Sequence, residues 1–291
     1  MSIEERDAVI ITAYADAPTR TVAAGGVDYA YRELGPKGGV PVVFLVHLAA
    51  TLDDWDPRII DPIAERHHVI TFDNRGVGAS TGAVPDTIEA MADDAATFIR
   101  ALGFDQVDLF SFSLGGMIAQ ALVAAHPSLV RKLVLTGTGP AGGAGIDKVA
   151  RTTFYDIARA TLTRKDPKEF LFFHRNATGR PAAKAFVDRL QERTVDRDDD
   201  ITARAFLTQL AAIRRWGRST PMDLSRITQP TLIANGDDDR MVPSVHRGDR
   251  PVDRSHGRFE GHRVRVPKAA AARHRGGRQG DEPGLPGPAP R

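Results

Sequence analysis

The residues best suited to chemistry lie in the stretch DLFSFSLGGMIAQ, residues 108–120. An apolar run ends at Phe112, Ser113 follows, and small residues lead directly into a helical pattern. A serine in a sharp strand-to-helix turn stands clear of the sheet, and its neighbours two positions away must be small so that the backbones can cross. Here those neighbours are Ser111 and Gly115. The pattern predicts a nucleophilic Ser113 facing the first amides of the next helix.

A cluster of carboxylates follows another apolar run. The run QPTLIANG (229–236) reads as a buried strand, and GDDDRMVP (236–243) comes directly after it. Three consecutive aspartates could suggest a metal site, but no histidine stands at ligand spacing from them. We therefore expect no metal and no other cofactor.

Composition excludes several classes of protein. The 291 residues contain no cysteine, which excludes a disulfide, a thiol nucleophile and a thiolate metal site. The N-terminal stretch MSIEERDAVIITAYADAPTR lacks the apolar run of a signal peptide, and no stretch reaches the roughly 18 apolar residues of a membrane span. These features predict a soluble cytoplasmic protein without a membrane partner. The oligomeric state stays open.

The net charge of +2 hides an uneven distribution. Residues 245–291 hold ten Arg and one Lys against three Asp and two Glu, a net charge of +6, so the first 244 residues carry −4. The folded part therefore gives no electrostatic reason to expect nucleic acid as a partner. A basic-tail nucleic-acid binder remains an alternative, and it would lose salt-dependent DNA binding when residues 245–291 are deleted.

Short apolar runs alternate with helical patterns along most of the chain. The runs are apolar nearly throughout, as in parallel strands covered on both faces, and an antiparallel ribbon over 20–35 precedes them. A helix over 86–103 should begin with a capping box of Asp86 and Glu89. This alternation predicts a mostly parallel, doubly wound α/β sheet. The predicted strands are residues 40–47, 67–74, 106–113, 131–139 and 229–236.

The interval 140–228 contains no strand pattern. It holds amphipathic helices around 148–163, 166–176, 181–193 and 201–216. An insertion of this kind between two strands predicts a helical cap over the carboxyl ends of the sheet. The predicted organisation is a core of residues 1–139 and 229–244, the cap over 140–228, and a separate tail over 245–291.

Four stretches, in order, resemble the α/β-hydrolase fold. They are HLAATLDDW (47–55), DNRGVGAS (73–80), the serine turn around Ser113, and GDDDRMVP (236–243). The second matches the Asp-x-Arg-Gly-x-Gly-x-Ser turn of that family, and the last matches its Gly-x-x-Asp-x-x-Val-Pro acid loop. The resemblance spans roughly residues 22–244.

The resemblance implies acyl transfer by a serine, with a small acyl compound as the substrate and an esterase-like or perhydrolase-like activity. It assigns Ser113 as the nucleophile and Asp239 as the acid that orients a histidine base. The N–H of Leu114 would be one donor of the oxyanion hole, and Leu48 or Ala49 would supply the second. Leu48 stands where the family often has Gly, which permits backbone angles that Leu avoids.

Two further expectations follow from the resemblance. Trp55, just past the oxyanion loop, is the candidate for the wall of a substrate pocket. The histidine base should follow the acid by roughly 25–30 residues, near 264–269, but that stretch reads VRVPKA. The resemblance therefore implies an impaired hydrolase, and the alternative is a noncatalytic binding protein on the same scaffold.

The tail offers only weak candidates for the missing base. His262 would lie at the wrong end of the sheet if RVRV (263–266) joined it in parallel, and His274 lacks apolar residues to fix its orientation. Fourteen of the 47 tail residues are Gly or Pro, which predicts disorder and leaves the strand at 229–236 as an exposed apolar edge prone to aggregation.

The abrupt loss of apolar periodicity beside an intact acid loop suggests a frameshift beginning near Ser244–His246. The Arg, Gly, Pro and Ala of the tail are the residues that a GC-rich gene yields when read out of frame. We expect another reading frame downstream of Ser244 to encode a strand followed by a Gly-His turn. Resequencing the locus tests this hypothesis. If the present reading frame is confirmed and no other frame downstream encodes a strand and a Gly-His turn, the hypothesis is wrong.

Overall fold

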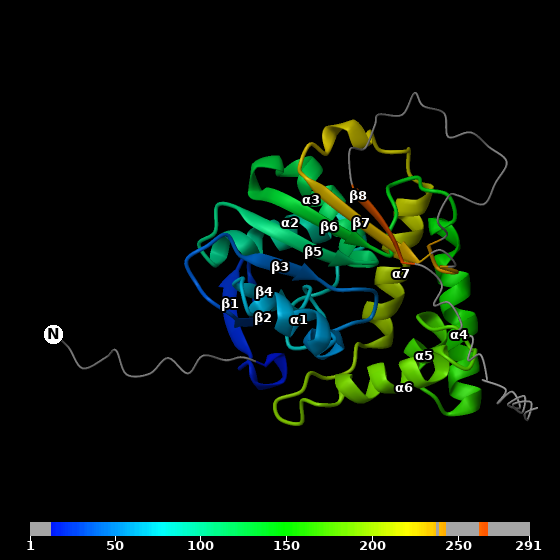
Figure 1. Cartoon of the computed structure of the whole chain (residues 1–291). Helices are drawn as coiled ribbons and strands as arrows, with labels where there is room; N and C mark the ends of the chain where they lie inside the picture. The colour runs from blue at the N-terminus through cyan, green and yellow to red at the C-terminus, as the bar shows by residue number, and fades with distance from the viewer. Residues whose placement is uncertain (1–12, 237–238, 243–261, 267–291) are drawn as a thin grey trace, which may run out of the picture.

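The computed structural model describes residues 13–236, 239–242 and 262–266, and within them eight strands form one sheet (Figure 1). The strand order is β1-β2-β4-β3-β5-β6-β7-β8. β2 pairs antiparallel with β1 and β4, which confirms the predicted ribbon, and all other neighbours are parallel. The strands are β1 (Arg20–Ala24), β2 (Val27–Leu34), β3 (Val42–Leu45), β4 (Val69–Phe72), β5 (Val107–Phe112), β6 (Val130–Thr136), β7 (Thr231–Gly236) and β8 (His262–Val266).

Helices cover both faces of the sheet because its central strands are apolar on both sides. Val43 of β3 packs on the face covered by α2 (Ile88–Ala101) and α3 (Leu114–Ala125). Its neighbour Phe44 packs on the opposite face with residues of α1 (Pro57–Ala64). Successive side chains of a strand point to opposite faces, so each strand contributes to two apolar cores. The predicted doubly wound α/β sheet is confirmed.

The start of α2 differs from the prediction. Thr87, not Asp86, is the N-terminal cap, and its hydroxyl accepts a hydrogen bond from the Ala90 N–H at 3.2 Å. The capping box of Asp86 and Glu89 was therefore wrong. Asp86 instead pairs with Arg215 at 3.0 Å, in a contact that leaves both side chains more than half exposed.

The interval between β6 and β7 is helical, as predicted. Figure 1 shows its helices gathered beside the carboxyl ends of the parallel strands. We call this segment, residues 137–230, the helical insertion. Its second helix is shorter than predicted. The four helices are α4 (Val149–Thr163), α5 (Pro167–Leu171), α6 (Gly179–Leu190) and α7 (Ala203–Arg218). Among the described residues, no helix is long and apolar enough to cross a bilayer.

A strand within the predicted tail corrects two expectations. β8 pairs in parallel with β7, from Leu232 opposite His262 to Gly236 opposite Val266. Residues 262–266 are therefore ordered into the sheet, and β7 is not its edge. The reason is local, because RVRV carries two β-branched residues in the alternation that favours a strand. The expected aggregation at an exposed β7 loses its structural basis.

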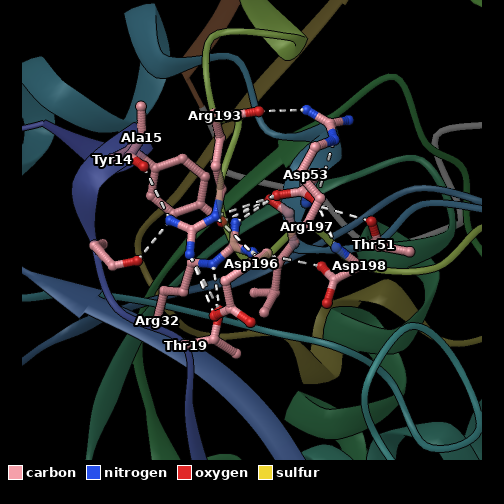
Figure 2. A network of polar contacts seen from close by, with 12 residues as sticks. Tyr14, Ala15, Thr19, Arg32, Thr51, Asp53, Arg193, Asp196, Arg197 and Asp198 are labelled. Atoms are coloured by element: carbon pink, nitrogen blue, oxygen red, sulfur yellow. Dashed lines mark hydrogen bonds and ion pairs between the residues drawn. The ribbon is translucent and has the colours of Figure 1, made fainter.

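A buried ionic network joins the helical insertion to the rest of the molecule (Figure 2). Arg32 of β2 is fully buried, and its Nη1 donates to Asp53 Oδ1 at 2.7 Å. Asp53 Oδ2 accepts from the Asp198 N–H at 2.8 Å, and the guanidinium groups of Arg193 and Arg197 each lie 3.9 Å from the same carboxylate. Asp53 thus receives contacts from β2 and from the loop between α6 and α7.

Two neighbouring acidic residues make the same kind of contact. Arg189 of α6 binds Asp56 through two hydrogen bonds, at 2.8 and 2.6 Å. Lys168 of α5 lies 3.0 Å from Asp54. Asp53 and Asp54 belong to the 3₁₀ turn η2 (Leu52–Asp54), just after the predicted oxyanion loop. The ion pairs therefore fix the insertion beside that loop.

Replacing Asp53 tests the weight of this network. Asp53→Asn removes the nearer of the two carboxylates beside the fully buried Arg32 guanidinium and leaves Asp198 at 3.7 Å. Breaking a buried pair costs about 3–5 kcal/mol, and because Asp198 remains we expect a loss at the lower end, about 3 kcal/mol. Urea denaturation measures the loss of unfolding free energy. Asp86→Asn is the control, because the exposed pair of Asp86 with Arg215 contributes about 1 kcal/mol or less. Equal effects of the two substitutions would contradict a special role for Asp53.

Candidate active site

Ser113 occupies a strained turn between β5 and α3. Its backbone angles are φ 54° and ψ −113°, a region that residues with a side chain seldom adopt. Its N–H donates to Thr136 O at 2.9 Å, and its carbonyl accepts from Thr138 Oγ1 at 2.7 Å. Strain of this kind, about 1–3 kcal/mol, persists only where the surroundings impose it, and it clusters at functional sites.

The strain follows from how closely α3 crosses the neighbouring strand. A Cβ on Gly115 would lie 2.0 Å from the carbonyl oxygen of Leu45, and one on Gly116 would lie 2.4 Å from the Thr138 side chain. Ser111 is fully buried and small enough to fit, with its hydroxyl donating to Val134 O at 2.6 Å. The small residues around Ser113 are thus steric requirements of the crossing.

The loop after β7 brings in the carboxylate of Asp239. Its Oδ1 accepts from the N–H groups of Met241 and Val242, at 2.8 and 3.0 Å. Burial raises the pKa of Asp239, and the two backbone hydrogen bonds oppose that rise. Oδ2 accepts no hydrogen bond from any described residue, which leaves it free to orient a base.

Sheet register places Ser113 and Asp239 on the same rim. β5, β6 and β7 are consecutive parallel strands, with Phe112 opposite Thr136 and Thr136 opposite Ala234. Both loops leave the carboxyl ends of their strands. A methyl group on Gly137 would lie 3.0 Å from the Phe112 ring and 3.8 Å from Asp239 Oδ2. The acid loop and the serine turn therefore lie beside each other.

The loop after β3 lies next to the serine turn, because β3 pairs with β5 up to Leu45 opposite Ser111. His47 is buried, and its Nδ1 lies 2.9 Å from the carbonyl oxygen of Leu48. A carbonyl only accepts, so Nδ1 carries the proton. Burial lowers the pKa of His47, which keeps the ring neutral. His47 thus supports the loop.

The positive φ in this loop falls on Ala49, at 61°, and not on Leu48. The unusual backbone angles that a family glycine suggested for Leu48 therefore occur one residue later, at Ala49. The Ala49 N–H donates to Gln209 Oε1 at 2.9 Å. Among the described residues, nothing accepts a hydrogen bond from the N–H of Leu48 or of Leu114, and their role in an oxyanion hole stays a prediction.

Trp55 lies in the apolar cluster on the face of the sheet that α1 covers. It is 4% exposed and packs edge-on against Phe44, with ring centroids 5.1 Å apart. This geometry describes core packing, and a pocket role for Trp55 stays a prediction. The aromatic ring that reaches toward the site from the insertion is Phe172, which contacts both Phe112 and His47. Nothing in the sequence distinguished Phe172 from the other phenylalanines of the insertion.

The described residues supply no base for the pair. Among the histidines up to His174, whose side chains the structure describes, none forms a hydrogen bond with Ser113 or Asp239. β8 runs parallel to β7 and begins with His262, so His262 lies at the amino end of the sheet, opposite the rim that carries Ser113. The structure thus excludes His262 as the base. His274, like His246 and His256, lies outside the described residues.

Two residues of the matched motifs, Asp73 and Arg240, make contacts near the site that the sequence did not indicate. Asp73, the first residue of the DNRGVGAS turn, is fully buried and accepts from the Leu52 and Ala79 N–H groups, at 2.9 and 3.1 Å. Burial, helped by the nearby Asp198, raises its pKa. Asp73 thus holds the segment that follows the oxyanion loop.

Arg240, beside the acid, contacts the helical insertion. Its Nη2 donates to the buried Asp156 of α4 at 2.6 Å and to the Phe170 carbonyl at 2.9 Å. The acid loop is thereby attached to α4 and α5. Within the part of the chain that the structure describes, no three His, Asp or Glu side chains gather in a way that could hold a metal ion.

Gly115→Ala tests the steric argument for the crossing. The added methyl group meets a backbone oxygen that cannot rotate away, so we expect a loss of about 3 kcal/mol in unfolding free energy. Gly39→Ala, where a Cβ meets nothing within 4 Å, should change it by less than about 0.5 kcal/mol. Chemical denaturation of both variants measures the difference. A Gly115→Ala variant as stable as the parent would refute the close crossing.

Known proteins resemble this chain over most of its length. A non-heme chloroperoxidase from Streptomyces lividans is 28% identical over 233 residues, covering 75% of this chain and 81% of the relative. A 2-hydroxy-6-oxo-6-(2'-aminophenyl)hexa-2,4-dienoic acid hydrolase from Metapseudomonas resinovorans is 29% identical, covering 77% of this chain and 76% of the relative.

The solved structure of an alpha/beta hydrolase fold protein from Chitinophaga pinensis superposes with a TM-score of 0.74 at 38% identity, covering 79% of this chain and 83% of that one. The family model for the alpha/beta hydrolase fold matches residues 40–268. This match includes the serine turn, the helical insertion and the acid loop. The chain belongs to the alpha/beta hydrolase fold family.

Proposed function

We propose that this chain is a serine hydrolase that acts on the carbonyl group of a small acyl compound. Ser113 is the nucleophile, Asp239 is the acid, and the N–H of Leu114 with the loop of Leu48 and Ala49 forms the oxyanion hole. The observation that carries the proposal is the strained turn at Ser113, held by a crossing that leaves no room for a side chain at Gly115.

The mechanism follows from these roles. The Ser113 oxygen attacks the carbonyl carbon as its proton passes to a base, and the amides bind the developing negative charge. Collapse expels the leaving group, and water then hydrolyses the acyl-serine. An ester fits this sequence, as do a thioester, a peracid and a ketone that can be cleaved. Of the two relatives, one is named a non-heme chloroperoxidase and the other a dienoic acid hydrolase, and the second name supports a hydrolase.

The helical insertion is proposed as a cap, within the domains 1–139 with 229–244 for the core and 140–228 for the cap. Its support is the contact of Phe172 with Phe112 and His47 and the attachment of Arg240 to α4. The segment 245–291 stands apart as a basic tail, for which a frameshift origin stays a hypothesis.

We propose that catalysis is impaired, because no described histidine reaches Asp239. Loss of the base leaves only the contribution of the oxyanion hole and of binding, a residual acceleration of about 10³–10⁴ over water. The same observation favours a second candidate, a noncatalytic binding protein on this scaffold. In the serine hydrolase Ser113 would react with an electrophile, whereas in the binding protein it would not.

Labelling with a fluorophosphonate tests the proposal. We expect slow labelling of the full chain at Ser113, located by peptide mass spectrometry, and none in Ser113→Ala. Ser111→Ala is the matched control and should still label, because the Ser111 hydroxyl is buried and bonded to Val134 O. Labelling that is absent from the parent chain would favour the binding protein. Equal labelling of the parent and Ser113→Ala would refute the role of Ser113.

A further inference from the structure

Gln209 of α7 reaches from the helical insertion into the predicted oxyanion loop. Its side chain is fully buried, and its Oε1 accepts the Ala49 N–H at 2.9 Å. The helix that carries it is firmly anchored, since Trp216 lies in the main apolar core and donates from Nε1 to Gly139 O at 3.2 Å. Gln209 therefore meets the loop from a rigid support, and no motif in the sequence pointed to it.

The orientation of the Gln209 amide follows from its partner. The Ala49 N–H is a donor, so the carbonyl oxygen of Gln209 must face it, because an NH₂ group there would oppose two donors. Gln209 Nε2 is buried and has no hydrogen-bond partner among the described residues. Burying Nε2 without a hydrogen bond is unfavourable, and the hydrogen bond at Oε1 holds the side chain in this position despite that cost.

The peptide between Leu48 and Ala49 is held at both polar ends. Its carbonyl accepts from His47 Nδ1, and its N–H donates to Gln209. A backbone N–H has one hydrogen and makes one strong hydrogen bond. This peptide therefore has no donor left for a ligand. The free donor in the loop is the N–H of Leu48, which belongs to the preceding peptide.

Gln209 also accounts for the backbone of Ala49. A φ of 61° is left-handed and unfavourable for a residue with a Cβ. The turn is short, with the Ala50 N–H donating back to His47 O at 3.4 Å. The contact with Gln209 is the only hydrogen bond of the Ala49 N–H among the described residues, so it is the side-chain contact that stabilises this conformation.

We propose that Gln209 is a positioning residue for the oxyanion hole. It holds the Ala49 amide in place and so assigns the second oxyanion donor to the Leu48 N–H, which acts with the Leu114 N–H. The inference rests on the proposed function for the role of these amides. The contact between Gln209 and Ala49 stands independently of any activity.

Amide hydrogen exchange tests the contact in the full chain. In protein labelled with ¹⁵N at Ala and Leu, Gln209→Leu removes the acceptor at similar volume, and the Ala49 amide should exchange about tenfold faster or more. Gln209→Glu keeps an acceptor and should restore slow exchange, which a purely space-filling role would not require. Gln229→Leu, far along the chain from this loop, is the matched control. Unchanged exchange at Ala49 in Gln209→Leu would overturn the proposal.

The donor assignment is tested with the phosphonyl adduct of the parent chain. Its phosphonyl oxygen enters the oxyanion hole, so the amide proton resonances of Leu48 and Leu114 should move downfield while that of Ala49 stays in place. Movement of the Ala49 resonance with loss of its slow exchange would overturn the assignment, because Gln209 would then be a plug that the ligand displaces. If Gln209→Leu fails to fold, the exchange rate of the Ala49 amide in Gln209→Glu and the amide shifts in the parent adduct still test the proposal.

Failure of the two proposals would look different. If no adduct forms, the proposed function fails and the assignment of Leu48 fails with it, whereas the exchange comparison still decides the Gln209 contact. If the adduct forms at Ser113 but shifts Ala49 alone, the function stands and the role given to Leu48 is wrong.

Discussion

Helix α3 crosses the end of β3 so closely that Gly115 has no space for a side chain, and the candidate site depends on this contact. The chain must turn sharply to reach that position, and Ser113 takes the strained conformation of the turn. The turn leaves the Leu114 amide at the open start of the helix. One steric constraint therefore sets the exposure of the hydroxyl and the direction of the nearest donor together.

The remaining parts of the site lie where the sheet meets the helical insertion, and both contribute residues to it. The sheet provides the serine turn, the acid loop and the loop of Leu48, which follow β5, β7 and β3 within a run of four neighbouring parallel strands. The insertion provides Gln209 and Phe172, and its cations pair with the acidic residues that follow the loop. Removing one partner of a buried pair of this kind is strongly destabilising, so these pairs disfavour any arrangement that separates the insertion from the sheet.

Much of this fold could be predicted because its signals are local. Runs of apolar residues marked the strands, and small residues around Ser113 marked the turn. The part that could not be predicted depends on tertiary contacts. Gln209 has no distinguishing neighbours in sequence, and its role exists only because the middle of α7 lies beside the loop that follows β3. The run RVRV has the alternation of a strand, but β8 is only five residues long and lies in a stretch rich in Gly and Pro, so its apolar content was too low to predict that it joins the sheet.

The capping residue of α2 illustrates a smaller limit. Asp86 and Thr87 are both good N-terminal caps, and Asp ranks somewhat above Thr, so the sequence favoured the residue that the helix does not use. The long-range contact of Asp86 with Arg215 decides between them. In the same way, the sequence pattern predicted a glycine-like backbone conformation at Leu48 of the oxyanion loop, whereas Ala49 adopts it.

The bond from Arg240 to Asp156 has a mechanical consequence. Arg240 and Asp239 are consecutive, so a tilt of α4 that carries Asp156 with it pulls on the backbone next to the carboxylate. A movement of the helical insertion would therefore reach Asp239 through the residue next to it, so the position of the carboxylate depends on the position of α4.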